Sequence, residues 1–544
     1  MTDRSTLQSP TATPDIDAYL EAFDWHPEPE LIAYRDEATS RAALASLGSS
    51  TWHHALEFLY GTAVVRAMGS PATYDEARRR YYRSDPGGPR TGPGPAPIGP
   101  TRARDVLAEF SDRVAGGLMN SQHPRQFGYF TPPPLPMSIM GELLAQVANQ
   151  GVDVWHAGPF AAFVEEEVIR WLCDLVGYAD GSFGLLTSGG VMANFMGMAL
   201  ARDLHLGKLR GLSAPPRGKD LEAARVYTSD QTHFSIARAL DELGFPRETL
   251  VVLPADDGFH LRGAGVATAV ASDRAAGLTP FAIAAVAGST NTGSIDAIGE
   301  LADVAEAEGL WLHVDAAYGG GVRLSARDRD RLTGLERADT VTVDPHKWFF
   351  QAYDIGGLLV RDGRGLAAVF GGRAPEYYRG GETPGSGLQA GSGGNDPDEH
   401  DTHGDQLNFY KLSFEGTRRW RALKLWMTWK HLGTEGFGRL IEANDDLAAY
   451  LARRCAEADD FEALPEVPEL SVVCFRHRPP GVAGAELDAH QDRLQVALES
   501  SGDGWLTTTR LRGATWLRAG IVNYLSTEAD IDRLLDTLRT LSIP

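Results

Sequence analysis

Short apolar segments alternate with segments of helical periodicity from about residue 135 onward, and this alternation restricts the fold more than any other feature. The apolar segments lie at residues 183–186, 282–287, 310–314 and 340–343, and helical patterns begin at Met192 and span 298–308. Strands that alternate with helices form parallel sheets, because a helix has to carry the chain back between parallel neighbours. We therefore predict an α/β fold whose mainly parallel central sheet is wrapped by helices.

Two stretches rich in glycine divide the rest of the chain. Residues 84–100 are almost entirely Pro, Gly and small residues, which cannot hold a regular element, and a second Gly-rich, polar stretch spans 371–404. Helical periodicity precedes the first stretch, and alternating strands and helices follow the second. We predict an N-terminal helical segment at 1–134 with a linker at 84–100, a large domain at 135–425, and a small α+β domain at 426–544.

The net charge is −22 at pH 7, and this excess of acid repels phosphate backbones and anionic lipid. Nucleic acid and membranes are therefore not expected as partners, and a small molecule is. The three cysteines, at positions 173, 455 and 474, show no metal spacing and no disulfide framework. We find no secretory signal pattern and no apolar run of membrane-spanning length, so we expect a cytoplasmic protein.

Lysine is scarce: only six of the 51 basic residues are lysine, and one of them, Lys347, lies in the apolar motif VTVDPHKW at 341–348. The motif indicates a short strand that ends in a turn, where parallel sheets place their active sites. Burial against Trp348, Phe349 and Phe350 disfavours an ammonium, so we expect a lowered pKa and an amine able to condense with an aldehyde. The alternative is a surface lysine at a strand end.

Three further motifs carry chemistry. Asp315 ends an apolar strand, where a carboxylate needs a cationic partner such as a protonated pyridine, although it could instead cap the next turn. Gly189 and Gly190 join a strand to a helix and could offer backbone amides to a phosphate, or form only a tight turn. His233 follows another strand, where an imidazole could lie on a cofactor ring, although a lone histidine is normally structural.

Together these motifs resemble the pyridoxal-phosphate-dependent group II amino-acid decarboxylases, the family of aromatic-L-amino-acid, glutamate and diaminobutyrate decarboxylases. The motifs are TSGG..AN at 187–194, SDQTH at 229–233, GSTNTGSID at 288–296, HVDAAYGG at 313–320 and DPHKW at 344–348. The similarity extends over residues 105–544, including HPRQFGYF at 123–130 and RRWRALKLW at 418–426. It implies a fold-type I transferase-like fold, pyridoxal 5'-phosphate as the cofactor, and an amino acid as the substrate.

The resemblance also implies roles for individual residues. Lys347 would form the covalent aldimine with the cofactor, Asp315 would pair with the pyridine nitrogen, and His233 would stack on the ring and help to protonate the product. The other implied cofactor contacts are Ala317 under the ring, the amides of Gly189, Gly190 and Val191 at the phosphate, Thr290 and Asn291 lining the site, and His346 near the phosphate.

The Gly-rich stretch contains Tyr377, which stands where the family keeps its lid tyrosine. By resemblance, this tyrosine protonates the substrate carbon after carbon dioxide leaves, within the site of a neighbouring subunit, and Tyr378 is the alternative. The resemblance therefore implies a homodimer with shared active sites. Retention of the tyrosine favours an amine product over an aldehyde.

Two positions depart from the family pattern. Val191-Met192 stands where the family commonly has Ser-Glu, which removes a hydroxyl from the phosphate site, and Phe163 aligns with a polar position. We expect the substrate pocket to be walled by Phe127, Tyr129, Phe130, Thr131 and Trp155, a set that suits an apolar or aromatic side chain. The alternatives are that these aromatics are core residues, or that Arg125 meets an acidic substrate.

The favoured function is an L-amino-acid decarboxylase that releases carbon dioxide and forms a primary amine. Two alternatives stay open: the same cofactor with another outcome, as in an oxidative aldehyde synthase or a carbon-carbon lyase, and a non-catalytic family member. His400 and His403 lie in an acidic loop and could bind a metal, but such loops are more often solvated, so we predict no metal site.

Overall fold

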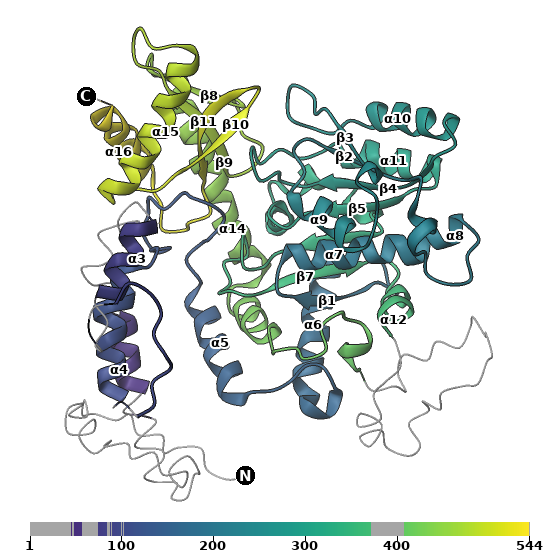
Figure 1. Ribbon diagram of the computed structural model, residues 1–544, viewed down its shortest axis with the longest axis horizontal. Coiled ribbons are helices and arrows are strands. Elements are labelled where there is room, and N and C mark those ends of the chain that lie inside the picture. Colours follow the sequence, from purple (N-terminus) through teal and green to yellow (C-terminus); the bar gives the residue numbers. More distant parts are fainter. Residues whose placement is uncertain are drawn as a thin grey trace, which may run out of the picture. The chain divides into compact units, whose positions relative to one another are not determined.

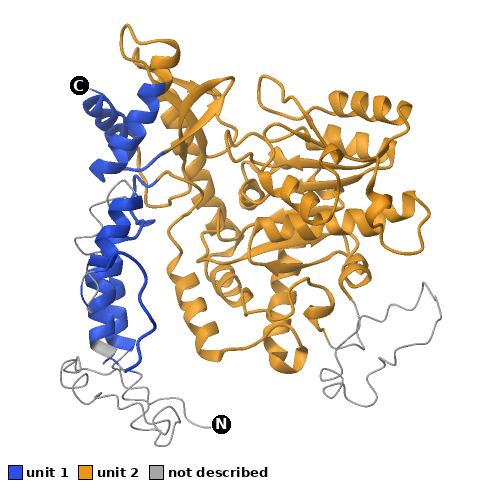
Figure 2. Ribbon diagram, in the orientation of Figure 1, with its two compact units in different colours: residues 1–126, 489–506, 529–544 blue, residues 127–488, 507–528 orange. Residues whose placement is uncertain are grey.

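Figure 1 shows the computed structural model, which describes residues 45, 48–56, 74–83, 88, 90–99, 101, 103–371 and 407–542. The chain divides into two compact units (Figure 2), one of residues 1–126, 489–506 and 529–544 and one of residues 127–488 and 507–528. No helix within the described ranges has both the length and the apolar character needed to cross a bilayer. The domain boundaries expected from the sequence differ from this division and stay a prediction.

The larger unit is built on a seven-stranded sheet with strand order β1-β7-β6-β5-β4-β2-β3. Its strands are β1 (Phe183–Thr187), β2 (Ala224–Ser229), β3 (Leu250–Leu253), β4 (Thr279–Val286), β5 (Trp311–Asp315), β6 (Thr340–Val343) and β7 (Gly356–Val360). Only β7 is antiparallel to its neighbours, because it follows β6 through a connection without a crossover helix. The expected mainly parallel sheet is confirmed.

Helices cover the sheet, as Figure 1 shows. They are α5 (Pro136–Ala148), α6 (Pro159–Val176), α7 (Gly190–Leu200), α9 (Phe234–Glu242), α10 (Gly263–Ala275), α11 (Ile298–Glu308) and α12 (Arg364–Phe370). Every residue of β6 and β7 is buried, which is typical of strands that are covered on both faces. The predicted helix at 298–308 has the bounds of α11, whereas α7 begins two residues before Met192.

A buried ion pair fixes the end of β1, where the Gly-rich turn begins. Arg418 and Glu165 are in contact with both side chains fully buried. Glu165 accepts the Leu186 amide at 3.1 Å, and Arg418 donates to the Leu186 carbonyl at 2.7 Å. Removing one partner of such a pair costs about 3–5 kcal/mol, because the other charge is left buried and uncompensated.

The C-terminal part adds a second, antiparallel sheet with strand order β10-β11-β9-β8. The remaining elements are β8 (Phe461–Leu464), β9 (Val472–His477), β10 (Thr507–Leu511), β11 (Ala514–Gly520), α14 (Ala422–Ala456), α15 (Gly484–Ser501) and α16 (Glu528–Leu541). Helix α14 is kinked at Gly433 (φ 64°). In the smaller unit, the N-terminal residues form α3 (Tyr74–Arg83) and α4 (Ala103–Glu109).

Candidate active site

A cavity of about 370 Å³ lies at the carboxyl ends of five strands, β1, β2, β4, β5 and β6. Its lining residues are Ser188, Gly189, Gly190, Val191, Met192, Asn194, His233, Val286, Gly288, Thr290, Asp315, Ala317, Tyr318, Asp344, His346, Lys347 and Tyr353. The β1, β2, β4, β5 and β6 strands run in one direction, so the turns that follow them converge at one edge of the sheet. Residues more than 150 positions apart in the sequence therefore share one site.

Lys347 lies in the turn after β6, and its amine is 3.0 Å from Asp344 Oδ2. Burial lowers the pKa of the Lys347 ammonium, but the Asp344 and Asp315 carboxylates outweigh burial, so the pKa is raised above its ordinary value. The lowered pKa expected from the neighbouring aromatics is therefore wrong. Trp348, Phe349 and Phe350 are buried as expected. However, Asp344 lies three residues before Lys347, and the turn between them places its carboxylate against the amine.

Asp315 is the last residue of β5 and is 6% exposed. Its Oδ1 accepts the Ala317 amide at 3.1 Å, and its Oδ2 accepts the Asn194 side-chain amide at 2.8 Å. These two donors fix the orientation of the Asp315 carboxylate at the cavity wall.

His233 is the residue that precedes α9, and its Nδ1 lies 2.8 Å from Ser235 Oγ. Burial lowers the pKa of His233 below its ordinary value, while Asp315 acts in the opposite direction. The imidazole ring of His233 lines the cavity and is uncharged near pH 7.

The turn between β1 and α7 forms a cradle for an anion. Gly189 has φ 153°, and a Cβ added at Gly190 would approach Asp344 Oδ2 to 2.9 Å and the Ala317 Cβ to 3.2 Å. A side chain at position 190 would therefore displace the Asp344 carboxylate or Ala317. The first turn of a helix has amides without intrahelical partners, and those at the start of α7 could hold a phosphate.

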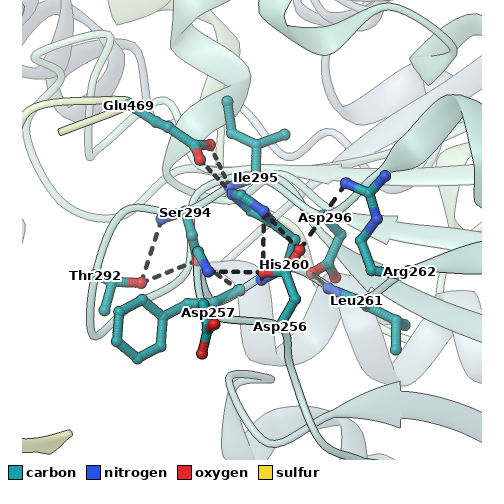
Figure 3. A network of polar contacts seen from close by, with 12 residues as sticks. Asp256, Asp257, His260, Leu261, Arg262, Thr292, Ser294, Ile295, Asp296 and Glu469 are labelled. Atoms are coloured by element: carbon teal, nitrogen blue, oxygen red, sulfur yellow. Dashed lines mark hydrogen bonds and ion pairs between the residues drawn. The ribbon is translucent and has the colours of Figure 1, made fainter. Parts of the chain in front are cut away.

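A polar network holds the segment that follows β4 (Figure 3). His260 contacts Glu469, whose other oxygen accepts the Ile295 amide at 2.9 Å. The hydrogen bond from His260 to Glu469 raises the pKa of His260 to about 9, so His260 is a cation at neutral pH. Asp296 accepts the amides of Leu261 and Val286, each at 2.7 Å. This network fixes the turn that carries Thr290 into the cavity.

Most residues predicted for the cofactor line this cavity: Lys347, Asp315, Ala317, His233, Gly189, Gly190, Val191, Thr290 and His346. Asn291 is placed elsewhere, since its side-chain oxygen accepts from Thr509 at 3.0 Å and its carbonyl accepts from Cys474. Tyr377 and Tyr378 lie outside the described residues, as do His400 and His403.

The five residues expected to wall the substrate pocket, Phe127, Tyr129, Phe130, Thr131 and Trp155, do not line the cavity. Phe127 is completely buried, and Phe130 stacks on Tyr318 with ring centroids 4.0 Å apart. Thr131 contacts a lining residue, because its hydroxyl lies 3.1 Å from that of Tyr353. Arg125 pairs with Asp503 at 2.9 Å and with Asp530 at 3.1 Å, which gives it internal partners in place of an acidic substrate.

No role was assigned from the sequence to eight of the lining residues, among them Asp344, Asn194 and Tyr353. Asp344 and Asn194 belong to motifs that were recognised, and their polarity within apolar segments was a usable signal. Tyr353 follows Lys347 in a connection without regular structure, where nothing in the local pattern indicates a direction for the side chain.

A family model described as the pyridoxal-dependent decarboxylase conserved domain matches residues 88–389 and 396–478. The chain belongs to this family. The protein is accordingly a carboxy-lyase of amino-acid metabolism that depends on pyridoxal phosphate.

Individual relatives agree with this membership. The chain is 30% identical to an aromatic-L-amino-acid decarboxylase of Bacillus atrophaeus over 440 residues, 81% of this chain and 85% of the relative. It is 31% identical to an L-2,4-diaminobutyrate decarboxylase of Rhizobium meliloti (strain 1021) over 447 residues, 82% of this chain and 83% of the relative. The glutamate decarboxylase domain of a Vibrio parahaemolyticus protein superimposes with a TM-score of 0.77 at 26% identity, covering 98% of this chain and all of that domain.

The residues around the cavity fit pyridoxal phosphate. An amine, a buried carboxylate and a neutral imidazole surround a space next to a glycine cradle at a helix start. Asp344 Oδ1 is buried without a hydrogen-bond partner in the described residues, which marks a polar atom that the folded chain alone does not satisfy.

Proposed function

We propose that this enzyme decarboxylates an L-amino acid with an apolar or aromatic side chain and releases a primary amine. The observation that carries the proposal is the convergence of Lys347, Asp315 and His233 on one cavity. The part of the cavity lining that a substrate side chain could meet includes Val191, Met192, Val286, Tyr318 and Tyr353, which supports an apolar or aromatic substrate. The similarity to an aromatic-L-amino-acid decarboxylase agrees with that class.

Bound pyridoxal phosphate supplies a carbonyl that an amine can attack and a cationic ring that accepts the electrons of a breaking bond. In our proposal, Lys347 would hold the cofactor through its amine. Asp315, which Asn194 and the Ala317 amide hold in place, would pair with the ring nitrogen. Gly189, Gly190 and Val191 would bind the phosphate with backbone amides, and His346 would lie beside them.

Proton delivery to the substrate carbon completes the reaction. His233 is neutral and lines the cavity, so it can orient the substrate and help to move a proton. We assign the proton donor role to Tyr377, as the resemblance implies. His346 packs against Tyr353 with ring centroids 4.7 Å apart, which keeps the imidazole in place beside the phosphate cradle.

The two departures from the family pattern leave this mechanism intact. Val191 would serve through its backbone amide, which does not depend on the side chain. Phe163 lies on α6, packs edge-to-face against Phe160 and does not line the cavity. The change from a polar residue to Phe163 therefore alters the exposed surface of α6 and not the lining of the cavity.

A homodimer is part of the proposal. Leu143, Leu144 and Val147 on α5 and Phe160 and Phe163 on α6 are all about half or more exposed. Exposed apolar groups of this size indicate a protein interface. A second copy would cover them in the homodimer that the resemblance implies, in which Tyr377 serves the neighbouring subunit's site. Three unbridged, buried cysteines agree with a cytoplasmic location.

The test is carbon dioxide release from a panel of amino acids by the cofactor-loaded enzyme. We expect kcat/KM to be highest for aromatic or large apolar substrates. Preference for an acidic or a diamino substrate would contradict the substrate class while keeping the decarboxylase.

A further inference from the structure

Asn194 on α7 is 1% exposed, lines the cavity and is hydrogen-bonded to four side chains. Its Nδ2 donates to Asp315 Oδ2 and to Ser235 Oγ, each at 2.8 Å. Its Oδ1 accepts from Thr342 Oγ1 at 2.7 Å and from His313 Nε2 at 3.0 Å. The buried amide therefore uses both of its ends.

The orientation of this amide follows from its partners. A carboxylate oxygen accepts hydrogen bonds, so the atom that faces Asp315 Oδ2 is the nitrogen. On the other side, Asn194 Oδ1 only accepts, so His313 Nε2 is the donor of that contact, and Thr340 Oγ1, which accepts from Trp311 at 3.1 Å, donates its own proton to His313 Nδ1 at 2.9 Å. His313 therefore carries its proton on Nε2 and donates it to Asn194. Burial lowers the pKa of His313 to about 4, which agrees with a neutral ring.

The hydrogen-bond partners of His233 also determine which of its ring nitrogens carries the proton. Ser235 Oγ accepts from Asn194, so its own proton is free to point at His233 Nδ1, 2.8 Å away. The Ser235 backbone amide also faces Nδ1, at 3.4 Å. Two donors directed at one nitrogen require that nitrogen to be unprotonated. The proton of the neutral ring is then on Nε2, at the edge turned away from Ser235.

The charged groups around His233 come from three elements. Asp315 ends β5, Asp344 and Lys347 lie in the turn after β6, and Arg238 lies on α9. The carboxylates favour the imidazolium, whereas Lys347 and Arg238 oppose it. These charges shift the pKa of His233 in opposite directions. Hydrogen-bond donors to Nδ1 therefore also influence whether the ring is protonated.

We propose that Asn194 and Ser235 are positioning residues that hold His233 as the Nε2–H tautomer and tie that state to the Asp315 carboxylate. The inference rests on the function proposed above, because it assigns His233 a proton to present to the substrate. Asn194 anchors Asp315 and, through the same nitrogen, directs the Ser235 hydroxyl. One buried amide thus orients both the carboxylate assigned to the ring nitrogen and the hydroxyl that faces His233.

The test is nitrogen NMR of the full-length, cofactor-loaded enzyme labelled with ¹⁵N-histidine, with the His233 signals assigned by comparison with His233→Gln. We expect wild type to show Nε2 protonated and Nδ1 unprotonated. Ser235→Ala and Asn194→Ala should give a mixture of tautomers, and Ser235→Thr should restore the single one. Ser325→Ala is the matched control, because Ser325 is also completely buried and hydrogen-bonded but lies outside the cavity.

The pH profile gives a second readout. Loss of a hydroxyl donor to Nδ1 stabilises the protonated ring, so the acidic limb of kcat/KM should move up by about 0.4 to 1 pH unit in Ser235→Ala. An unchanged tautomer and an unchanged acidic limb in Ser235→Ala would overturn the proposal, as would equal changes in Ser325→Ala. Wild type that shows the predicted tautomer but releases no carbon dioxide from any amino acid would contradict the proposed function instead, and would support the positioning role.

Discussion

The amine of Lys347 lies 3.0 Å from the Asp344 carboxylate, in the turn that leaves β6. This ion pair holds the lysine as an ammonium before the cofactor binds, because Asp344 and Asp315 together raise its pKa against the effect of burial. Only the neutral amine can attack a carbonyl, so the ion pair controls how readily the cofactor is loaded.

Asp344→Asn should therefore speed cofactor loading at neutral pH. The variant lowers the pKa of Lys347, and each unit of pKa changes the amine fraction about tenfold. The loading rate should rise with pH in both proteins, and this rise should occur at a lower pH in the variant than in wild type. Absorbance of the bound cofactor after mixing measures the rate, and Asp303→Asn, in an exposed acid on α11, is the control. Identical pH profiles for Asp344→Asn and wild type would refute this role.

Lys347→Ala should abolish covalent attachment of the cofactor. Borohydride reduction followed by mass analysis of the intact protein should add the cofactor to wild type and to Lys208→Ala, whose lysine is exposed and outside the cavity. Reducible cofactor that persists in Lys347→Ala would mean that another amine holds it.

Tyr377→Phe should divert part of the product from amine to aldehyde, because the phenolic proton no longer reaches the substrate carbon. Products are separated by chromatography and identified by mass. Tyr378→Phe is the matched control and should leave the ratio of amine to aldehyde unchanged. If both variants form only amine, the proton donor is a different residue.

Glu469→Gln should weaken the network of Figure 3 in a pH-dependent way. The pKa of His260 is raised to about 9 in the folded protein, so its contribution is complete below the ordinary value of about 6.5 and is lost as the pH rises through 9. After allowance for partial exposure, we expect the variant to lose about 1–2 kcal/mol near pH 6 and almost nothing near pH 10. Denaturant unfolding at the two pH values measures the difference. A loss that is the same at both would show that His260 is not the titrating group.

The sequence predicted much of the site because strand ends are visible in an apolar pattern. Lys347, Asp315 and His233 each follow a short apolar strand, and a parallel sheet brings such ends to one edge. The predicted pKa of Lys347 was wrong because local composition shows the aromatics, but not that the turn returns Asp344 to the amine.

The substrate residues were harder to predict, because an aromatic sequence does not distinguish a core from a pocket. Phe130 stacks on Tyr318 and is closed off from the cavity, whereas Tyr353, which the sequence did not indicate, lines it. Asn291 lies in a motif that suggests the cofactor, yet its side chain bonds to Thr509 on β10. Long-range partners decided the direction of each of these side chains, and no local pattern contains them.

The most direct test of the account is mass spectrometry of the products after the cofactor-loaded enzyme is incubated with a pool of natural amino acids. The account predicts a primary amine that is lighter than one substrate by carbon dioxide. A carbonyl product formed together with ammonia and peroxide would contradict it and would assign the enzyme to oxidative chemistry.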